Sequence, residues 1–276
     1  MTIGRRSESE FSQAAERPPG RAAAFFDLDK TLIMGSSAIE FARASYEAGL
    51  LTRRQLARDA LANVQFRLHG STDEATDALR DRIFASIKDT RVVDLQRLGP
   101  RVLAGVLPRV YPQMLQVAYE HQDAGRPVYI VTAASHEMAE LMAHVLVFDG
   151  GIGARSEVVD GRYTGRPEGP FTYREGKAEA IRALADAEGY DLGGSYAYSD
   201  SESDLPMLRA VGHPVAVNPD KELLRIARAE GWDVMTFDRL GRRLKAAMGL
   251  LAMAAVGGVG REVAVRRTRP RPRGRR

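Results

Sequence analysis

The stretch that decides the fold runs from Ala22 to Leu32 and reads AAAFFDLDKTL. Its apolar first half predicts a buried strand, which stops at two carboxylates two positions apart, Asp27 and Asp29. If the extended backbone continues through them, both side chains lie on the same side. Two buried like charges are costly unless a cation such as Mg2+, which prefers oxygen ligands, pairs them. A carboxylate can also act as a nucleophile, and the plainer alternative is a polar strand end that caps the next helix.

Two other apolar runs end in the same way. Residues 128–131 stop at Thr132, and residues 196–199 stop at Asp200, with Asp204 four residues later. Ligands of open parallel sheets bind outside the carboxyl ends of the strands, so three such ends predict one shared crevice. Lys177, which opens a helical pattern between the second and third runs, is a fourth member of the set.

This ordered set resembles the four-motif signature of haloacid dehalogenase (HAD) superfamily phosphatases, over about residues 22–237. The Thr-Ala-Ala-Ser motif at 132–135 and a long helical pattern after the first strand resemble the phosphoserine phosphatase-like branch, subfamily IB. The resemblance implies an α/β fold, a Rossmann-like parallel sheet with a helical cap domain inserted after the first strand. We expect the phosphatase core at 22–34 and 126–240 and the cap at 35–125.

The resemblance also implies a role for each acidic residue. Asp27 is the nucleophile that forms an aspartyl-phosphate, and Asp29 is the general acid and then the general base. Mg2+ is held by the Asp27 carboxylate, the backbone carbonyl of Asp29 and Asp200. Asp204 orients the water molecules of the metal or holds the lysine.

The remaining residues of the set bind the phosphoryl group. Thr132 and the backbone N–H groups that follow it, beginning with Ala133, grip the phosphate oxygens. Lys177 neutralises charge on the phosphoryl group and on Asp27, the kind of electrostatic help that phosphoryl transfer needs. The implied activity is hydrolysis of a small phosphorylated metabolite, a phosphomonoester, with Mg2+ as cofactor.

Two departures leave the substrate open. Phosphoserine phosphatases carry a Glu shortly after the first motif that reads the amino group, and Ser36 stands at that place here. The fourth motif reads SDSESD at 199–204 instead of the usual Gly-Asp-Gly-x-Asn-Asp. We therefore expect phosphoserine to be a poor substrate. A non-catalytic relative that binds a phosphorylated ligand, or one whose main role is membrane tethering, is the alternative.

Composition and the chain ends set further bounds. The chain has 276 residues, 44% hydrophobic and 28% charged, and its lack of cysteine excludes thiolate catalysis, disulfides and cysteine zinc sites. Residues 1–21 are polar and predict disorder. Residues 241–276 hold an apolar stretch, 246–260, and a tail with eight Arg and one Glu, 261–276. We expect a cytoplasmic protein, with an anionic membrane surface as a candidate partner of this tail and no specific nucleic acid partner.

Local patterns predict several further elements. Ser37 and Glu40, Thr52 and Gln55, and Ser71 and Glu74 have capping-box spacing and predict helix starts. Helices are expected at 91–105 and 111–125, a short strand near 145–148, and a hairpin at 157–164 with an Asp160-Gly161 turn of type I′. The last part predicts strands at 214–217 and 232–237 around a helix at 220–230.

Overall fold

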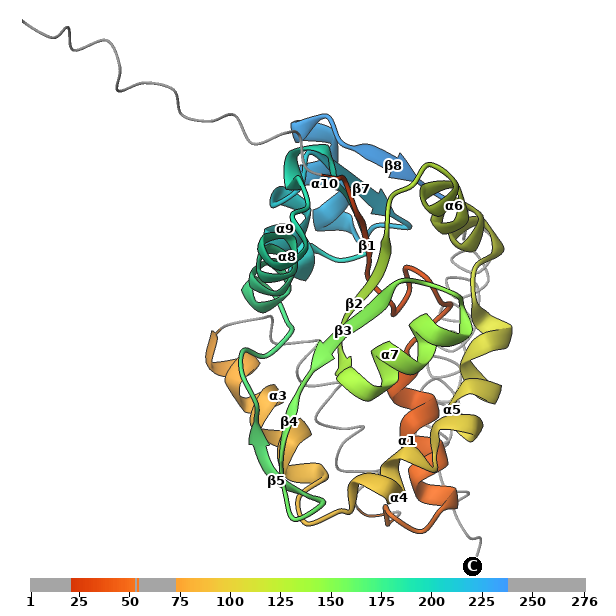
Figure 1. Ribbon diagram of the computed structural model, residues 1–276, viewed down its shortest axis with the longest axis vertical. Helices are drawn as coiled ribbons and strands as arrows, with labels where there is room; N and C mark the ends of the chain where they lie inside the picture. The colour runs from red at the N-terminus through yellow and green to blue at the C-terminus, as the bar shows by residue number, and fades with distance from the viewer. Residues whose placement is uncertain (1–20, 53, 55–72, 238–276) are drawn as a thin grey trace, which may run out of the picture. The chain divides into compact units, whose positions relative to one another are not determined.

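A six-stranded parallel sheet in the order β3-β2-β1-β6-β7-β8 forms the centre of the fold (Figure 1). The computed structural model describes residues 21–52, 54 and 73–237. The strands are β1 (Ala24–Phe26), β2 (Val128–Ser135), β3 (Gly150–Ala154), β6 (Tyr196–Ser199), β7 (His213–Val217) and β8 (Asp233–Met235). The expected α/β fold with a Rossmann-like parallel sheet is confirmed.

The order of the strands fixes where a ligand can bind. From β1 the chain moves outward to β2 and β3, and it then returns to the other side of β1 for β6, β7 and β8. β1 therefore lies at a topological switch point, where the crevice at the carboxyl ends of the strands opens. Asp27 follows β1 and Asp200 follows β6, its direct neighbour in the sheet.

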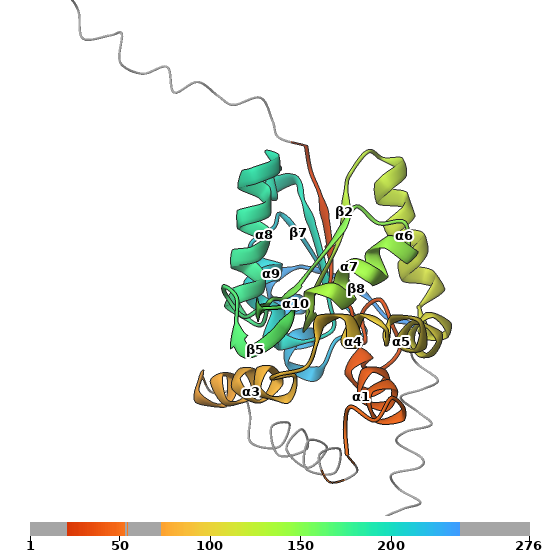
Figure 2. The ribbon, with the colours of Figure 1, turned by 60° about the horizontal axis from the view of Figure 1, so that its bottom comes forward.

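Alternate residues of β1 fill the cores on the two faces of the sheet. Phe25 packs with Ile181, Met207 and Leu223, which come from the helices α8 (Glu175–Glu188), α9 (Leu205–Arg209) and α10 (Lys221–Glu230). Phe26 stacks on Tyr198, its partner in register on β6, with the ring centroids 4.3 Å apart. The helices α6 (Pro112–Asp123) and α7 (His136–Val145) lie on the face opposite α8 (Figure 2). Burying each phenylalanine contributes about 2 kcal/mol to folding.

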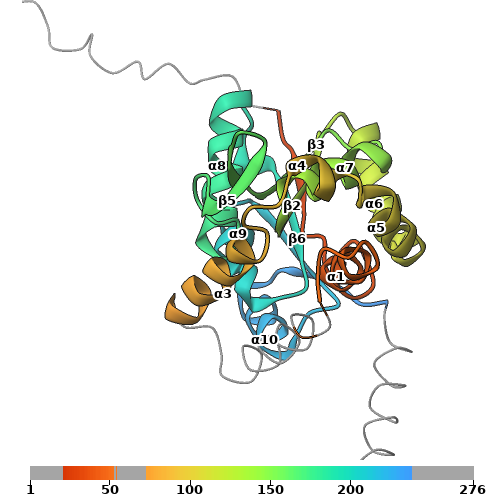
Figure 3. The ribbon, with the colours of Figure 1, turned by 90° about the horizontal axis from the view of Figure 1, so that it is seen from below.

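The segment between β1 and β2 is helical where it is described. Before α6 it holds α1 (Ser37–Glu47), α3 (Asp73–Ser86), α4 (Val92–Gln96), α5 (Gly99–Val106) and the 3-10 turn η1 (Leu107–Arg109). These helices lie on the side of the sheet where the parallel strands end (Figures 2 and 3). The helical content agrees with the expectation, and the division into a core and a cap stays a prediction.

A β-hairpin follows β3 and confirms the expected turn. Its antiparallel strands are β4 (Ser156–Val159) and β5 (Arg162–Pro167), with Val159 opposite Arg162. The turn residues Asp160 and Gly161 have φ values of 49° and 72°, the two positive values that a type I′ turn requires. After β5 the chain forms α8 and then the 3-10 turn η2 (Leu192–Gly194), which leads into β6 of the sheet.

Some local expectations were wrong. The strand expected near 145–148 does not form, because α7 continues to Val145 with Met138 and Met142 buried on its inner side. The strand β3 begins instead at Gly150. A β-carbon on Gly151 would lie 2.2 Å from the carbonyl carbon of Ala139, so only glycine lets this strand approach α7. The helix expected at 91–105 is two helices, α4 and α5.

The capping box expected at Ser37 is also not formed. The N-cap is Ser36, without a side-chain capping bond, and Ser37 lies inside α1. Glu40 instead pairs with Arg109 at 2.6 Å. The box at Ser71 and Glu74 and the one at Thr52 and Gln55 involve residues outside the described ranges.

The predictions about the two chain ends fall outside the described residues. These are the disorder of 1–21, apart from Arg21, and the membrane role of the apolar stretch and Arg-rich tail within 241–276. Within residues 21–52, 54 and 73–237, no helix is long and apolar enough to cross a membrane. The cytoplasmic location and the membrane contact stay predictions.

Candidate active site

Asp27, the first residue after β1, is held by a lysine from a distant part of the chain. The Nζ atom of Lys177 donates to Oδ1 of Asp27 at 2.6 Å. Both residues are buried, with 6% of the surface of Asp27 and 2% of that of Lys177 exposed. Lys177 lies in the first turn of α8, so the packing of this helix on the sheet brings the ammonium group to the end of β1.

The same lysine holds a second carboxylate. Its Nζ atom donates to Oδ2 of Asp204 at 2.7 Å, and the hydroxyl of Ser199 donates to the same oxygen, also at 2.7 Å. Asp204 ends the 3-10 turn η3 (Glu202–Asp204) that follows β6. Of the two roles expected for Asp204, holding the lysine is the one that these contacts support.

Asp200 lies at the end of β6 and is buried as well. Its Oδ2 atom accepts from Nζ of Lys30 at a long 3.4 Å, and the lysine side chain is 55% exposed. The peptide carbonyl of Asp200 accepts from the N–H of Asp220, the N-cap of α10, at 2.9 Å. The backbone position of Asp200 is therefore fixed, while the one ion pair of its carboxylate among residues 21–52, 54 and 73–237 is loose.

The carboxylates outnumber the cations in this buried cluster. Burial raises the pKa of Asp27 to about 8, with Lys177 acting in the opposite direction and Asp204 and Asp200 adding to the rise. Burial also raises the pKa of Asp200 to about 6, against the effect of Lys30. Burial acts to lower the pKa of Lys177, but Asp204 and Asp27 outweigh it and raise that pKa. A further cation at this place would relieve the excess of negative charge.

Asp29 has separate surroundings. β1 ends at Phe26, so the extended backbone that would put Asp27 and Asp29 on one side does not continue. The Oδ2 atom of Asp29 accepts from the hydroxyl of Ser36 at 2.7 Å, and Oδ1 accepts from the backbone N–H of Ser37 at 2.8 Å. The start of α1, not the neighbouring strand ends, holds this carboxyl group.

The expected phosphate-binding residues lie in the last part of β2. Thr132 is 3% exposed, and its hydroxyl oxygen accepts from the N–H of Ala134 at 3.2 Å. Ala133, between them, is half-buried. Ser135 ends the strand and caps α7 by accepting from the N–H of Met138 at 3.3 Å. The end of β2 thus passes directly into the N-terminus of α7, where backbone N–H groups favour anions.

The donors present fit Mg2+. They are oxygens, the Asp27 and Asp200 carboxylates are buried, and burial raises the pKa of both, so a bound cation would favour their ionised forms. In the described part of the chain, no three His, Asp or Glu side chains converge as a ready-made cage. The expected set uses only two carboxylates and one backbone carbonyl, that of Asp29, so it does not need such a cage.

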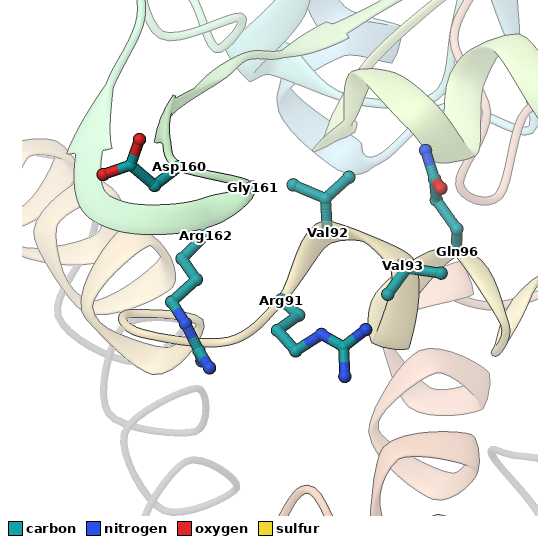
Figure 4. A pocket seen from close by; sticks show the side chains of 7 residues that line it. All are labelled: Arg91, Val92, Val93, Gln96, Asp160, Gly161 and Arg162. Carbon is teal, nitrogen blue, oxygen red and sulfur yellow. The ribbon is translucent and has the colours of Figure 1, made fainter.

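A hollow elsewhere on the molecule does not include these residues. It lies between the start of α4 and the hairpin turn, and Arg91, Asp160 and Arg162 are among its lining residues (Figure 4). The backbones of Arg91 and Arg162 pair in an isolated antiparallel β-bridge. The guanidinium of Arg162 donates to the carbonyl of Asp89 at 2.7 Å. The side chain of Asp160 points away from both arginines (Figure 4). This hollow is lined by residues of the hairpin turn and of the start of α4, and none of the carboxylate cluster lines it.

Two residues of the site were not assigned these contacts from the sequence. Ser199 was expected only as the last residue of its strand, and the bond to Asp204 has no sequence signal beyond the short spacing. Ser36 was expected at the place of a substrate-reading residue, but its hydroxyl contacts Asp29. A serine seven residues after an aspartate in a loop gives no warning of such a bond.

Comparison with known proteins adds an independent finding. The family model for haloacid dehalogenase-like hydrolases matches residues 24–209. The chain is 39% identical, over 86% of its length and 89% of the relative, to a Streptomyces azureus protein named "Inhibition of morphological differentiation protein". It is 38% identical to phosphoserine phosphatase SerB1 of Mycobacterium tuberculosis, over 89% of this chain and 81% of the relative.

The fold has a close match among solved structures. A crystal structure of a Bordetella pertussis protein of unknown function is 30% identical, with a TM-score of 0.71, over 78% of this chain and 98% of that one.

Proposed function

This chain belongs to the haloacid dehalogenase-like hydrolases and is a phosphoric monoester hydrolase, and from that premise we propose that it cleaves a small phosphomonoester through an aspartyl-phosphate on Asp27. The observation that supports this most strongly is the buried contact of Lys177 with Asp27, at 2.6 Å. An ammonium group held against a buried carboxylate at a switch point can balance the charge of an incoming phosphoryl group.

In the first half of the reaction, an Oδ atom of Asp27 attacks phosphorus while the ester P–O bond breaks. The leaving oxygen takes a proton from the Asp29 carboxyl group, which leaves Asp29 ionised. Lys177 stays charged and offsets the negative charge on the phosphoryl oxygens, together with the N–H groups after Thr132. Asp204 and Ser199 keep the ammonium group in place.

In the second half, Asp29 takes a proton from a water molecule whose oxygen attacks phosphorus. The bond between phosphorus and Asp27 then breaks, inorganic phosphate leaves, and both carboxyl groups return to their starting states. Mg2+, when bound, would neutralise phosphoryl charge, and we assign it to the Asp27 carboxylate, the Asp29 backbone carbonyl and the Asp200 carboxylate.

The substrate is a small phosphorylated compound, and we keep the expectation that phosphoserine is a poor one. The relative named phosphoserine phosphatase supports the reaction type. In this chain, however, position 36 carries a hydroxyl that already contacts Asp29, and no carboxylate that could bind a substrate ammonium group stands there.

The test combines turnover with chemical trapping. Purified protein is assayed on p-nitrophenyl phosphate and on a panel of phosphorylated metabolites, with Mg2+ and after chelation. Protein mixed with substrate is then reduced with borohydride, which converts an aspartyl-phosphate to homoserine. We expect metal-dependent turnover and homoserine at position 27 in the peptide mass spectrum. Turnover without any trapped product at position 27 would reject the aspartyl-phosphate.

A further inference from the structure

The carboxyl group of Asp29 has one hydrogen-bond donor on each oxygen. Ser36 donates from its hydroxyl to Oδ2 at 2.7 Å, and Ser37 donates from its backbone N–H to Oδ1 at 2.8 Å. Two donors on opposite oxygens fix the plane of a carboxyl group, which otherwise turns freely about its last bond. One of the two donors is a side chain and can be removed without altering the backbone.

The loop from Lys30 to Ser36 folds back on itself and sets the position of Ser36. The N–H of Lys30 donates to the carbonyl of Gly35 at 3.0 Å, and the N–H of Met34 donates to the carbonyl of Arg109 at 2.7 Å. Gly35 has φ of 90°, a value that glycine adopts without strain. The backbone bonds therefore bring residue 36 back beside Asp29 before any side chain is considered.

An ion pair between a buried glutamate and a partly exposed arginine fixes the helix that begins there. Glu40, in the first turn of α1, is 6% exposed and its Oε1 atom lies 2.6 Å from Nη2 of Arg109. Arg109 is the residue whose carbonyl holds Met34, so the same residue anchors both the loop and the first turn of α1. The hydroxyl of Ser36 is thus presented to Asp29 by a fixed frame.

We propose that Ser36 is a positioning residue that orients the Asp29 carboxyl group for proton transfer, an inference that rests on the proposed function of Asp29. Ser36 gives up no proton in the reaction. Its hydroxyl donates to Oδ2 and holds the carboxyl plane, so that the proton of Asp29 passes to the leaving oxygen and a water proton later returns. General acid catalysis of this kind contributes on the order of 10²–10⁴-fold, and a misoriented acid loses part of it.

The test uses leaving groups that differ in acidity but little in shape. An acid matters little for p-nitrophenyl phosphate, whose leaving group departs as a stable anion, and matters more for phenyl phosphate. Ser36→Ala, Ser36→Thr and Asp29→Asn are compared with wild type on both esters and on ring-substituted phenyl phosphates between them. Ser45→Ala is the matched control, since Ser45 is a serine of α1, the helix that the half-buried N-cap Ser36 precedes, and its buried hydroxyl has no hydrogen-bond partner among the described residues.

We expect Ser36→Ala to lower kcat/KM about 10-fold on phenyl phosphate and less than about 3-fold on p-nitrophenyl phosphate. Ser36→Thr, which keeps the hydroxyl, restores the wild-type dependence on leaving-group acidity, and Ser45→Ala does not alter it. A merely structural role would lower both rates equally. Thermal unfolding of each variant verifies that it is folded.

The outcomes separate the inference from its premise. If Asp29→Asn depends more steeply on leaving-group acidity than wild type while Ser36→Ala runs parallel to wild type, the positioning role is wrong and the acid role of Asp29 stands. If Asp29→Asn itself runs parallel to wild type, Asp29 is not the acid, and the inference fails together with that part of the proposed function.

Discussion

Asp27 and Asp29 are two residues apart in the sequence, yet the molecule builds their surroundings in opposite ways. The partner of Asp27 is Lys177, 150 residues away, and both are buried. The partners of Asp29 are Ser36 and Ser37, only 7 and 8 residues away, on a partly buried loop. One carboxylate belongs to the sheet and the helices packed on it, and the other belongs to the start of α1.

This difference indicates a division of labour. The long-range half, made by Asp27, Lys177, Asp204 and Ser199, is a fixed arrangement of charge that every phosphoryl group would meet. In the proposed mechanism, the local half, made by Asp29 and its two serine donors, acts on the leaving group. Changes in the first half should therefore affect all substrates equally, and changes in the second should depend on the leaving group.

The largest effect is expected from Asp27→Asn. The amide keeps the shape of the side chain but cannot attack phosphorus, so kcat/KM should fall by at least about 10³-fold on phenyl and p-nitrophenyl phosphate alike. Since burial makes the ionised carboxylate costly, the melting temperature should not fall. Steady-state assays and thermal unfolding measure both effects, with Asp123→Asn, an exposed change on α6, as control. Near-native turnover by Asp27→Asn would remove the proposed nucleophile.

The second largest effect is expected from Lys177→Met. Loss of the ammonium group should lower kcat/KM on the order of 10²–10³-fold, equally for both leaving groups. It also leaves Asp27 and Asp204 buried without their shared partner, which costs about 3–5 kcal/mol of unfolding free energy in urea titration.

The control for that variant is Lys30→Met. Lys30 is 55% exposed and 3.4 Å from Asp200, so its loss should cost less than about 1 kcal/mol. If the two variants had similar unfolding free energies, the contrast between a buried and an exposed lysine at this site would be wrong.

The sequence predicted the residues at the strand ends better than the contacts of Asp29. Asp27, Asp200 and Thr132 end apolar runs, and strand order then brings such residues together, so their meeting place could be expected before any coordinates. The bond of Ser36 to Asp29 depends on the loop from Lys30 to Gly35, which no periodic pattern describes. Tertiary packing also overrides a local pattern at 145–148. The apolar run there predicted a strand, but α7 continues to Val145 and packs closely on Gly151.

A third, smaller effect concerns Mg2+ and pH. Burial holds the folded-state pKa of Asp27 near 8 and that of Asp200 near 6, above the value of about 4 in an unfolded chain. Such groups stabilise the fold while they are protonated, and this contribution is lost as the pH rises from about 4 through the folded values. Protons therefore compete with a cation between about pH 6 and 8.

Mg2+ at a fixed concentration should then raise the melting temperature more at pH 8 than at pH 6. At 100 times the dissociation constant the gain is about 2.7 kcal/mol, or roughly 5–10 °C for a chain of this size. Differential scanning calorimetry with and without chelator measures it, and Asp200→Asn should lose the gain. An equal gain at both pH values, or one that Asp200→Asn retains, would place the cation elsewhere.

The smallest effect lies on α1 itself and compares two of its glutamates. Glu40 is buried and pairs with Arg109 at 2.6 Å, whereas Glu47 pairs with Arg43 at 3.0 Å and both of those side chains are exposed. Glu40→Gln should cost about 1–2 kcal/mol, less than Lys177→Met, because the freed Arg109 is 39% exposed and can be solvated. Glu47→Gln should cost less than about 0.5 kcal/mol, and this cost should shrink as the salt concentration rises.

Because Arg109 also holds the loop that presents Ser36, Glu40→Gln should lower kcat/KM a few-fold on phenyl phosphate and leave p-nitrophenyl phosphate nearly unchanged. Equal unfolding free energies and equal rates for the two variants would show that the pair of Glu40 with Arg109 does not support Asp29.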